Sequence, residues 1–240
     1  MATERTPDVA LVDPGAPQEL PEGYPAQWEC DSVLADGRPV HIRPVRPEDK
    51  DKILRFHAGL SEESIHLRFF SALKRLPDLL LHRFTHVDYD SRMVLLALLG
   101  DEVIAMASYD RALDRPEAEV AFAVADAHHG RGLATLLLEH LVEIARAQGI
   151  ERFTADTLPH NRAMLQVFRN AGYRLEAASA EGTVHIRFPI APTPEARGKL
   201  EAREHRAEAE SVARLLAPRV IAFVGAGPEQ GTVGHEILRN

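Results

Sequence analysis

Residues 119–141 of the chain read EVAFAVADAHHGRGLATLLLEHL, and this stretch decides the fold. It opens with an apolar run that ends near Val124, which predicts a buried strand. A turn with Gly130 and Gly132 follows, and leucines then recur at helical spacing until Gly149, a residue suited to end a helix. A strand, a glycine turn and a long helix in this order bring backbone N–H groups and a helix dipole together, which is an arrangement that can hold a pyrophosphate.

Further strands and helices are predicted on both sides of this stretch. Upstream are a strand at 38–45, a helix from Pro47, two short helical pieces at 61–70 and 77–86, and a hairpin of strands 93–99 and 102–109 around Gly100 and Asp101. Downstream are a strand at 152–158, a helix at 161–172, and strands at 173–179 and 183–190. Strands joined first by a hairpin and later through helices predict a mixed sheet covered by helices, in the α/β (α+β) class.

The chain divides into four regions by composition. Residues 1–27 hold five prolines without helical or strand periodicity and are interpreted as a flexible N-terminal arm. Residues 28–190 form the predicted folded domain, and the alanine- and charge-rich residues 191–218 form a solvated linker helix. Residues 219–240 combine an apolar strand, a glycine-rich turn and a helix start, which predicts the beginning of a truncated CoA- or nucleotide-binding α/β domain.

Charge and composition narrow the classes of function. The formal net charge of −8, from 36 acidic and 28 basic residues, argues against nucleic-acid binding through a basic face. No apolar run reaches the length of a membrane span and no signal peptide is recognised, so we expect a cytoplasmic protein without a membrane partner. Cys30 is the only cysteine, and His82 and His86 lack a third ligand, so no disulfide and no metal site are predicted.

The quoted stretch, together with NRAMLQVFRNAGY at 161–173, resembles the acetyl-CoA-binding core of the GNAT N-acetyltransferases. That family's turn is Gln/Arg-x-x-Gly-x-Gly/Ala; Gly132 and Ala134 match it, whereas His129 replaces the leading residue. The replacement weakens one side-chain contact and leaves the backbone groups of the turn in place. The resemblance covers about residues 39–190 and implies the GNAT fold, a mixed splayed sheet of about seven strands flanked by helices, with the cosubstrate acetyl-CoA in the cleft beside residues 119–124.

The resemblance also implies which residues bind the cofactor. They are Phe122, Ala123, Val124, His129, Gly130, Arg131, Gly132, Leu133, Ala134 and Asn161. The first three would offer backbone groups to the pantetheine arm as an added strand does, and an N–H there could polarise the thioester carbonyl. Asn161 can contact the cofactor, cap its helix, or do both.

Two shorter stretches narrow the resemblance to one subfamily. SEESIHLRFF (61–70) and AEVAFAV (118–124) resemble the bacterial Pat-type protein lysine acetyltransferases, and FVGAGPEQGTVG (223–234) resembles the start of the NDP-forming acyl-CoA synthetase-like domain that is fused to many of them. In that subfamily the general base is a glutamate on the strand before the turn, which corresponds to Glu119. A base is needed because lysine has a pKa near 10.4, so only about one amine in a thousand is nucleophilic at neutral pH.

Other roles for these positions stay open. Glu119 could instead pair with an arginine, and Glu117, on the same face of the strand, is the nearest rival for the base. Many family members carry a tyrosine as general acid seven residues after the asparagine; here that position is Phe168, so we predict no dedicated acid. A CoA thiolate can leave without full protonation.

The resemblance implies an acetyl-CoA-dependent protein lysine N-acetyltransferase that works by direct transfer in a ternary complex. Its expected acceptors are acyl-CoA synthetases, which are switched off when an active-site lysine is acetylated and loses its charge. Two alternatives are a small-molecule amine N-acetyltransferase and a non-catalytic acyl-CoA sensor. The acceptor protein, the acyl-chain preference, the oligomeric state and any regulation by the C-terminal domain do not follow from the sequence.

Overall fold

The computed structural model describes residues 20–112, 114–180 and 182–217. The greater part of the predicted N-terminal arm and the predicted truncated domain at 219–240 lie outside the described residues. The described end of the arm packs on the domain, because Tyr24 lies against the core and its ring meets Tyr89 edge-on at 5.6 Å.

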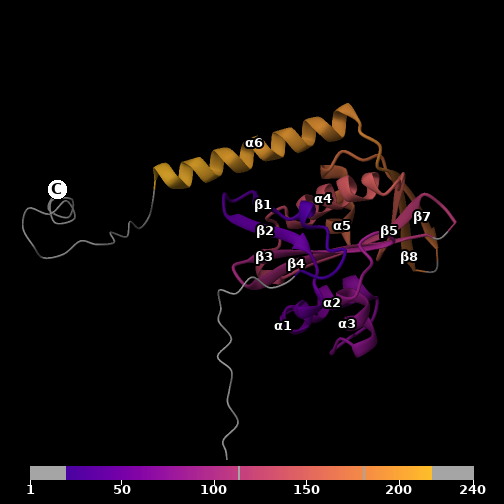
Figure 1. The fold of residues 1–240 in the computed structure, drawn as a ribbon. Coiled ribbons are helices and arrows are strands. Elements are labelled where there is room, and N and C mark those ends of the chain that lie inside the picture. The colour runs from indigo at the N-terminus through magenta and orange to yellow at the C-terminus, as the bar shows by residue number, and fades with distance from the viewer. Residues whose placement is uncertain (1–19, 113, 181, 218–240) are drawn as a thin grey trace, which may run out of the picture.

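One sheet runs through the whole domain, in the order β1-β2-β3-β4-β5-β6-β8-β7 (Figure 1). Its strands are β1 (Cys30–Val33), β2 (Pro39–Pro44), β3 (Arg92–Leu99), β4 (Glu102–Arg111), β5 (Glu117–Val124), β6 (Arg152–Thr157), β7 (Glu176–Ala180) and β8 (Thr183–Pro189). Only β5 and β6 pair in parallel, so the predicted mixed sheet is confirmed. The sheet has eight strands rather than about seven, because β1, whose short and largely polar sequence carries no strand signal, pairs with β2.

The sheet is splayed at its centre. The parallel ladder between β5 and β6 covers only three pairs, from Glu117 opposite Arg152 to Glu119 opposite Thr154. Beyond Glu119, β5 stays paired with β4 as far as Val124, but its other edge has no strand partner among the described residues. This split leaves backbone groups free at the middle of the sheet.

Helices cover both faces of the sheet. They are α1 (Lys50–Ala58), α2 (Glu62–Phe69), α3 (Asp78–Thr85), α4 (Leu133–Ala147), α5 (Arg162–Asn170) and α6 (Pro194–Leu216), with short 3₁₀ turns η1 (Ala26–Trp28), η2 (Pro47–Asp49) and η3 (Asp126–His128). α1 to α3 lie on one face, and α4 and α5 lie on the other, with α6 outside them (Figure 1). Within the described part of the chain, no helix has the length and apolar character that a membrane crossing requires.

Each face of the sheet has its own hydrophobic core. The apolar stripe of α4 supplies Leu137, Leu138 and Leu141, all fully buried, to the larger core, and α4 packs there on β3, β4 and β5. Ile53 of α1, Ile65 of α2 and Phe84 of α3 contribute to the smaller core on the opposite face. Burial of one large apolar side chain is worth about 1.5–3 kcal/mol, so α4 is among the strongest anchors of the fold.

Candidate functional site

A groove of about 790 Å³ lies where β5 and β6 separate. The predicted general base and all the predicted cofactor-binding residues line this groove: Glu119, Phe122, Ala123, Val124, His129, Gly130, Arg131, Gly132, Leu133, Ala134 and Asn161. They come from β5, from the glycine turn with the start of α4, and from the start of α5. The splay therefore gathers predicted residues from distant parts of the sequence into one cavity.

The free edge of β5 forms one wall of the groove. Phe122 and Ala123 are buried, and their ladder partners on β4 are Ala107 and Met106. Because the β6 side of this edge is unpaired after Glu119, alternate N–H and C=O groups there face the groove without a strand partner. Such groups need hydrogen bonds, and an extended amide-containing ligand can supply them as an added strand would.

The glycine turn opens directly into the groove. Gly130 and Gly132 have φ values of +75° and +81°, in the left-handed region that favours glycine, and a Cβ built on either would meet nothing within 4 Å. α4 starts at Leu133 without a side-chain cap, so its first N–H groups keep their capacity to donate. An uncapped helix start behind open glycines can bind an anion such as a diphosphate.

The histidine that replaces the usual leading residue of the turn has a structural role. His129 Nε2 lies 3.0 Å from the carbonyl oxygen of Val124, and since a carbonyl only accepts, the ring nitrogen donates. This bond fixes the turn against the end of β5. The carbonyl oxygen of Val124 therefore already accepts a hydrogen bond, whereas its N–H group faces the unpaired edge of β5.

Asn161 caps α5 at the edge of the groove. Its Oδ1 accepts a hydrogen bond from the N–H of Met164 at 3.1 Å, which satisfies one donor at the helix start. The amide nitrogen of the same side chain has no partner within the described residues, and Asn161 lines the groove. The capping role predicted from the sequence is confirmed, and the cofactor contact stays a prediction.

The two glutamates of β5 have different surroundings. Glu117 is buried and accepts hydrogen bonds from Arg187 and, at 3.1 Å, from Arg152. The bond from Arg187, with a further contribution from Arg152, lowers the pKa of Glu117 below its usual range. Glu119 is exposed to the groove and makes no ion pair within the described residues. Of the two carboxylates, only Glu119 can accept a proton from a ligand in the groove.

Arg68 of α2 also lines the groove, although the sequence analysis did not predict it as a site residue. Its guanidinium lies 5.2 Å from the ring centre of Phe69 and 5.9 Å from that of Phe84, and it makes no ion pair with any described residue. Burial lowers the pKa of Arg68 to about 10, so it stays charged at neutral pH, and Glu119 is the main charge that opposes this shift. No local sequence signal marks Arg68, because its position depends on how α2 packs on β5.

A small polar cluster positions α2 beside the turn. Asp126, in η3, accepts hydrogen bonds from Ser61 N at 2.9 Å, Ser61 Oγ at 2.6 Å and Ser64 Oγ at 2.8 Å. Ser61 Oγ in turn accepts from Ser64 N and caps α2, as its place before the helix predicts. The first turn of α2 is therefore fixed to the segment between β5 and the glycine turn.

Phe168 lies outside the groove. Its side chain is fully buried, 4.8 Å from the ring centre of Phe188 and 6.2 Å from that of Phe122. The position at which the family resemblance leads one to expect a tyrosine is therefore part of the core in this chain. Elsewhere, the rings of His82 and His86 stack at 3.9 Å, and the described residues contain no cluster of three or more potential metal ligands.

The sequence and the fold match known acetyltransferases. The model of the acetyltransferase (GNAT) family matches residues 61–173. The crystal structure of the GNAT domain of S. lividans PAT is 43% identical, with a TM-score of 0.66 over 69% of this chain and 99% of that one. Acetyltransferase PA5475 of Pseudomonas aeruginosa is 32% identical over 55% of this chain and 73% of its own length. Acetyltransferase Pat of Mycolicibacterium smegmatis is 34% identical over 57% of this chain, and the match spans 41% of that longer protein.

Proposed function

Because the chain belongs to the acetyltransferase (GNAT) family and is an acyltransferase, we propose that it transfers the acetyl group of acetyl-CoA to a lysine side chain of a protein. The family uses acetyl-CoA, and the groove has the features this cosubstrate requires: an uncapped helix start with open glycines for the diphosphate, and a free strand edge for the pantetheine amides. The similarity to the S. lividans PAT domain and to Pat supports a protein acceptor.

The observation that carries the mechanism is the free carboxylate of Glu119 at the split between β5 and β6. In the proposed reaction Glu119 takes a proton from the lysine ammonium, directly or through one water, as the amine nitrogen attacks the thioester carbonyl. The carbon–sulfur bond then breaks and CoA leaves as the thiolate. The acetyl group stays on the nitrogen, which releases its second proton to water and becomes an amide. The backbone N–H of Phe122 or Val124, on the unpaired edge of β5, stabilises the carbonyl oxygen as negative charge develops on it.

The proposed acceptors are acyl-CoA synthetases, inactivated when acetylation removes the charge of an active-site lysine. Glu119 is exposed in the groove, so a lysine on the surface of such a protein can approach it. We expect the reaction to take place in the cytoplasm, and the full-length protein to carry a fused synthetase-like domain, as the resemblance of residues 223–234 implies.

The test uses radiolabelled acetyl-CoA with a bacterial lysate and, in parallel, with a purified acyl-CoA synthetase. Wild-type protein is expected to label discrete protein bands and to inactivate the synthetase, and Glu119→Gln is expected to do neither. Label found only in the small-molecule fraction would replace the proposal with a small-amine acetyltransferase. Binding of acetyl-CoA without transfer to either fraction would replace it with an acyl-CoA sensor.

A further inference from the structure

α6 lies outside the residues that match the family model, which end at 173, yet it borders the groove. The sequence predicted a solvated linker helix at this position. The structure differs on one face of the helix: α6 crosses over α4, α5 and β1 (Figure 1), and Ala207 at its middle is only 3% exposed. A helix with one buried face is part of the domain and not simply a spacer.

Two glycines allow α6 to approach the domain closely at both ends of the contact. A Cβ on Gly172, just after α5, would lie 2.8 Å from the Cα of Ala196. A Cβ on Gly37, in the turn between β1 and β2, would lie 2.8 Å from the backbone carbon of Glu210. Neither distance is possible for a real side chain, so both contacts depend on glycine.

Polar contacts along α6 also hold the helix on the domain. Lys199 Nζ donates to the carbonyl oxygen of Arg169 at 2.7 Å, and Arg203 Nε donates to Glu139 of α4 at 3.1 Å. Arg214 donates to the carbonyl oxygen of Asp36 at 3.0 Å. The helix is therefore held in one position against α4, α5 and the turn between β1 and β2.

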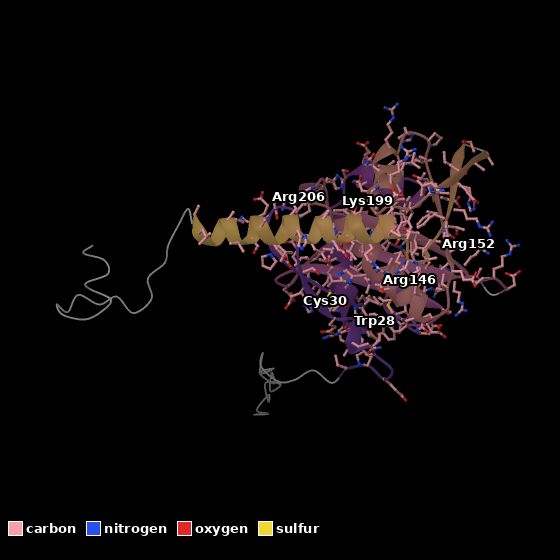
Figure 2. All side chains as sticks on the ribbon, turned by 90° about the horizontal axis from the view of Figure 1, so that it is seen from above. Trp28, Cys30, Arg146, Arg152, Lys199 and Arg206 are labelled. Carbon is pink, nitrogen blue, oxygen red and sulfur yellow. The ribbon has the colours of Figure 1, made fainter. Side chains whose placement is uncertain are left out.

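Three basic residues of α6 line the groove: Lys199, Arg203 and Arg206. Their spacing of four and three residues places them on one face of the helix, and the axial distance from the first to the last is about 10 Å. Figure 2 shows Lys199 and Arg206 along the part of α6 that crosses the domain. Lys199 and Arg203 are already engaged by domain groups, whereas Arg206 has no hydrogen-bond or ion-pair partner within the described residues.

Arg206 lies near the glycine turn, and the connection between β1 and β2 links the two. One helical turn further on, Glu210 touches Gly37, and the same β1–β2 connection donates a hydrogen bond from Ala35 N to the carbonyl oxygen of Arg131 at 3.4 Å. Arg206 therefore lies at the end of the groove that contains the proposed phosphate-binding turn. A free arginine at this place can form two parallel hydrogen bonds to one phosphate group.

We propose that α6 is a wall of the cofactor site and that Arg206 binds a phosphate group of CoA. The inference rests on the proposed use of acetyl-CoA and adds a binding residue from outside the family core. CoA carries a 3′-phosphate and a diphosphate, both anionic, whereas the chain has a net charge of −8. Cations that line the groove must therefore offset the unfavourable negative potential of the whole chain. Arg206 supplies one such cation, and no described residue forms an ion pair with it.

The test is calorimetric titration of the full chain with CoA and with dephospho-CoA. Arg206→Ala is compared with Arg197→Ala, which removes another exposed arginine of α6 that does not line this groove and has no side-chain partner within the described residues. We expect Arg206→Ala to raise the Kd for CoA about tenfold and to reduce its salt dependence, and Arg197→Ala to stay within about twofold of wild type. Thermal unfolding confirms that both variants are folded.

The two ligands identify which phosphate is bound. If Arg206→Ala loses affinity for CoA alone, Arg206 binds the 3′-phosphate. If it loses affinity for CoA and dephospho-CoA equally, Arg206 binds the diphosphate. Either result supports the proposal. Equal CoA affinity of wild type and Arg206→Ala, or equal losses in Arg206→Ala and Arg197→Ala, would overturn it while the acetyl-CoA assignment stands. Failure of the wild-type chain to bind CoA would overturn the proposed function and this inference together.

Discussion

Glu117 and Glu119 lie two residues apart on one face of β5, but only Glu119 opens into the groove with a free carboxylate. Glu117 is 7% exposed and is bound by Arg152 and Arg187, which come from β6 and β8. It therefore ties together three strands on the side where the sheet is still paired. The point at which the β5–β6 ladder ends separates a structural glutamate from the proposed catalytic one.

This difference predicts opposite effects for two isosteric substitutions. Glu119→Gln is expected to lower kcat by about 10²–10⁴ with little change in stability, because it removes only the proton acceptor. Glu117→Gln is expected to cost about 1–3 kcal/mol of unfolding free energy, because Arg152 and Arg187 lose their charged partner, with kcat close to wild type. Steady-state kinetics and urea unfolding of both variants give the comparison. The reverse pattern, with activity lost in Glu117→Gln alone, would move the base to Glu117.

The glycine turn predicts a second matched pair. Gly132→Asp places a carboxylate at the proposed phosphate site, and we expect the Kd for CoA to rise at least about a hundredfold through charge repulsion. Gly149→Asp introduces the same residue at a similar φ of +74°, also with open space around the Cβ, but away from the groove. Calorimetry should show near wild-type affinity for Gly149→Asp. Unchanged affinity in Gly132→Asp would refute the assignment of the turn.

Much of the fold follows from local sequence signals. The hairpin at Gly100, the capped start of α2 at Ser61 and the ends of α4 and α5 before Gly149 and Gly172 are all confirmed. These features depend on neighbouring residues, whose backbone preferences are visible in the sequence. β1 was missed because Cys30–Val33 has no apolar alternation, and its pairing with β2 is a tertiary contact.

The residues of the site also divide into those that a local sequence signal marks and those that tertiary packing places. The glycine turn and β5 carry signals of their own, so the residues predicted there gather in one groove. Arg68 and Arg206 reach the groove through helix packing, which depends on contacts such as that between Gly37 and Glu210, 173 positions apart in the chain. The alanine- and charge-rich pattern of α6 is typical of a solvated helix, and small alanines such as Ala207 gave no apolar stripe to indicate the buried face.

The burial of Phe168 predicts the effect of introducing the tyrosine that the family resemblance leads one to expect there. Phe168→Tyr would put a hydroxyl into a fully buried aromatic cluster, away from the groove, and we expect a loss of about 1–3 kcal/mol in stability. Because the Phe168 side chain does not line the groove, we expect kcat and its pH profile to stay unchanged. Thermal unfolding and a pH–rate profile measure both effects. A raised kcat with a new alkaline limb would show that this position can supply a general acid.

The contact between Gly37 and Glu210 predicts how α6 can be released. Gly37→Ala forces a Cβ into the helix backbone at a φ of +77°, and we expect a loss of about 1–3 kcal/mol, faster proteolysis within α6 and weaker CoA binding. Gly100→Ala has a comparable φ of +62° but open space, so it reports the backbone strain alone. Limited proteolysis and calorimetry of the two variants separate the effects. Equal cleavage of α6 in both would contradict the docking contact.

His140 of α4 predicts a pH dependence of stability. Its Nε2 lies 3.7 Å from Cys30 Sγ and 3.5 Å from Ser32 Oγ. Burial, with a smaller effect of Arg203, lowers the pKa of His140 to about 4. An unfolded histidine has a pKa near 6.5, so between about pH 6.5 and 4 the unfolded chain binds a proton that the folded chain does not. The contribution of neutral His140 to stability is therefore complete above pH 6.5 and is lost as the pH falls.

We expect this loss to reach about 2 kcal/mol by pH 4.5, after allowance for partial exposure of the ring. Burial raises the pKa of the neighbouring Glu139, which acts in the opposite sense, so the measurement is a difference between variants that keep Glu139. His140→Gln cannot take up the proton, and its urea unfolding free energy should fall less steeply than that of wild type between pH 6.5 and 4.5. His205→Gln, at an exposed histidine of α6, should follow the wild-type curve. Parallel curves for wild type and His140→Gln would show that His140 is protonated in the folded chain as readily as in the unfolded one.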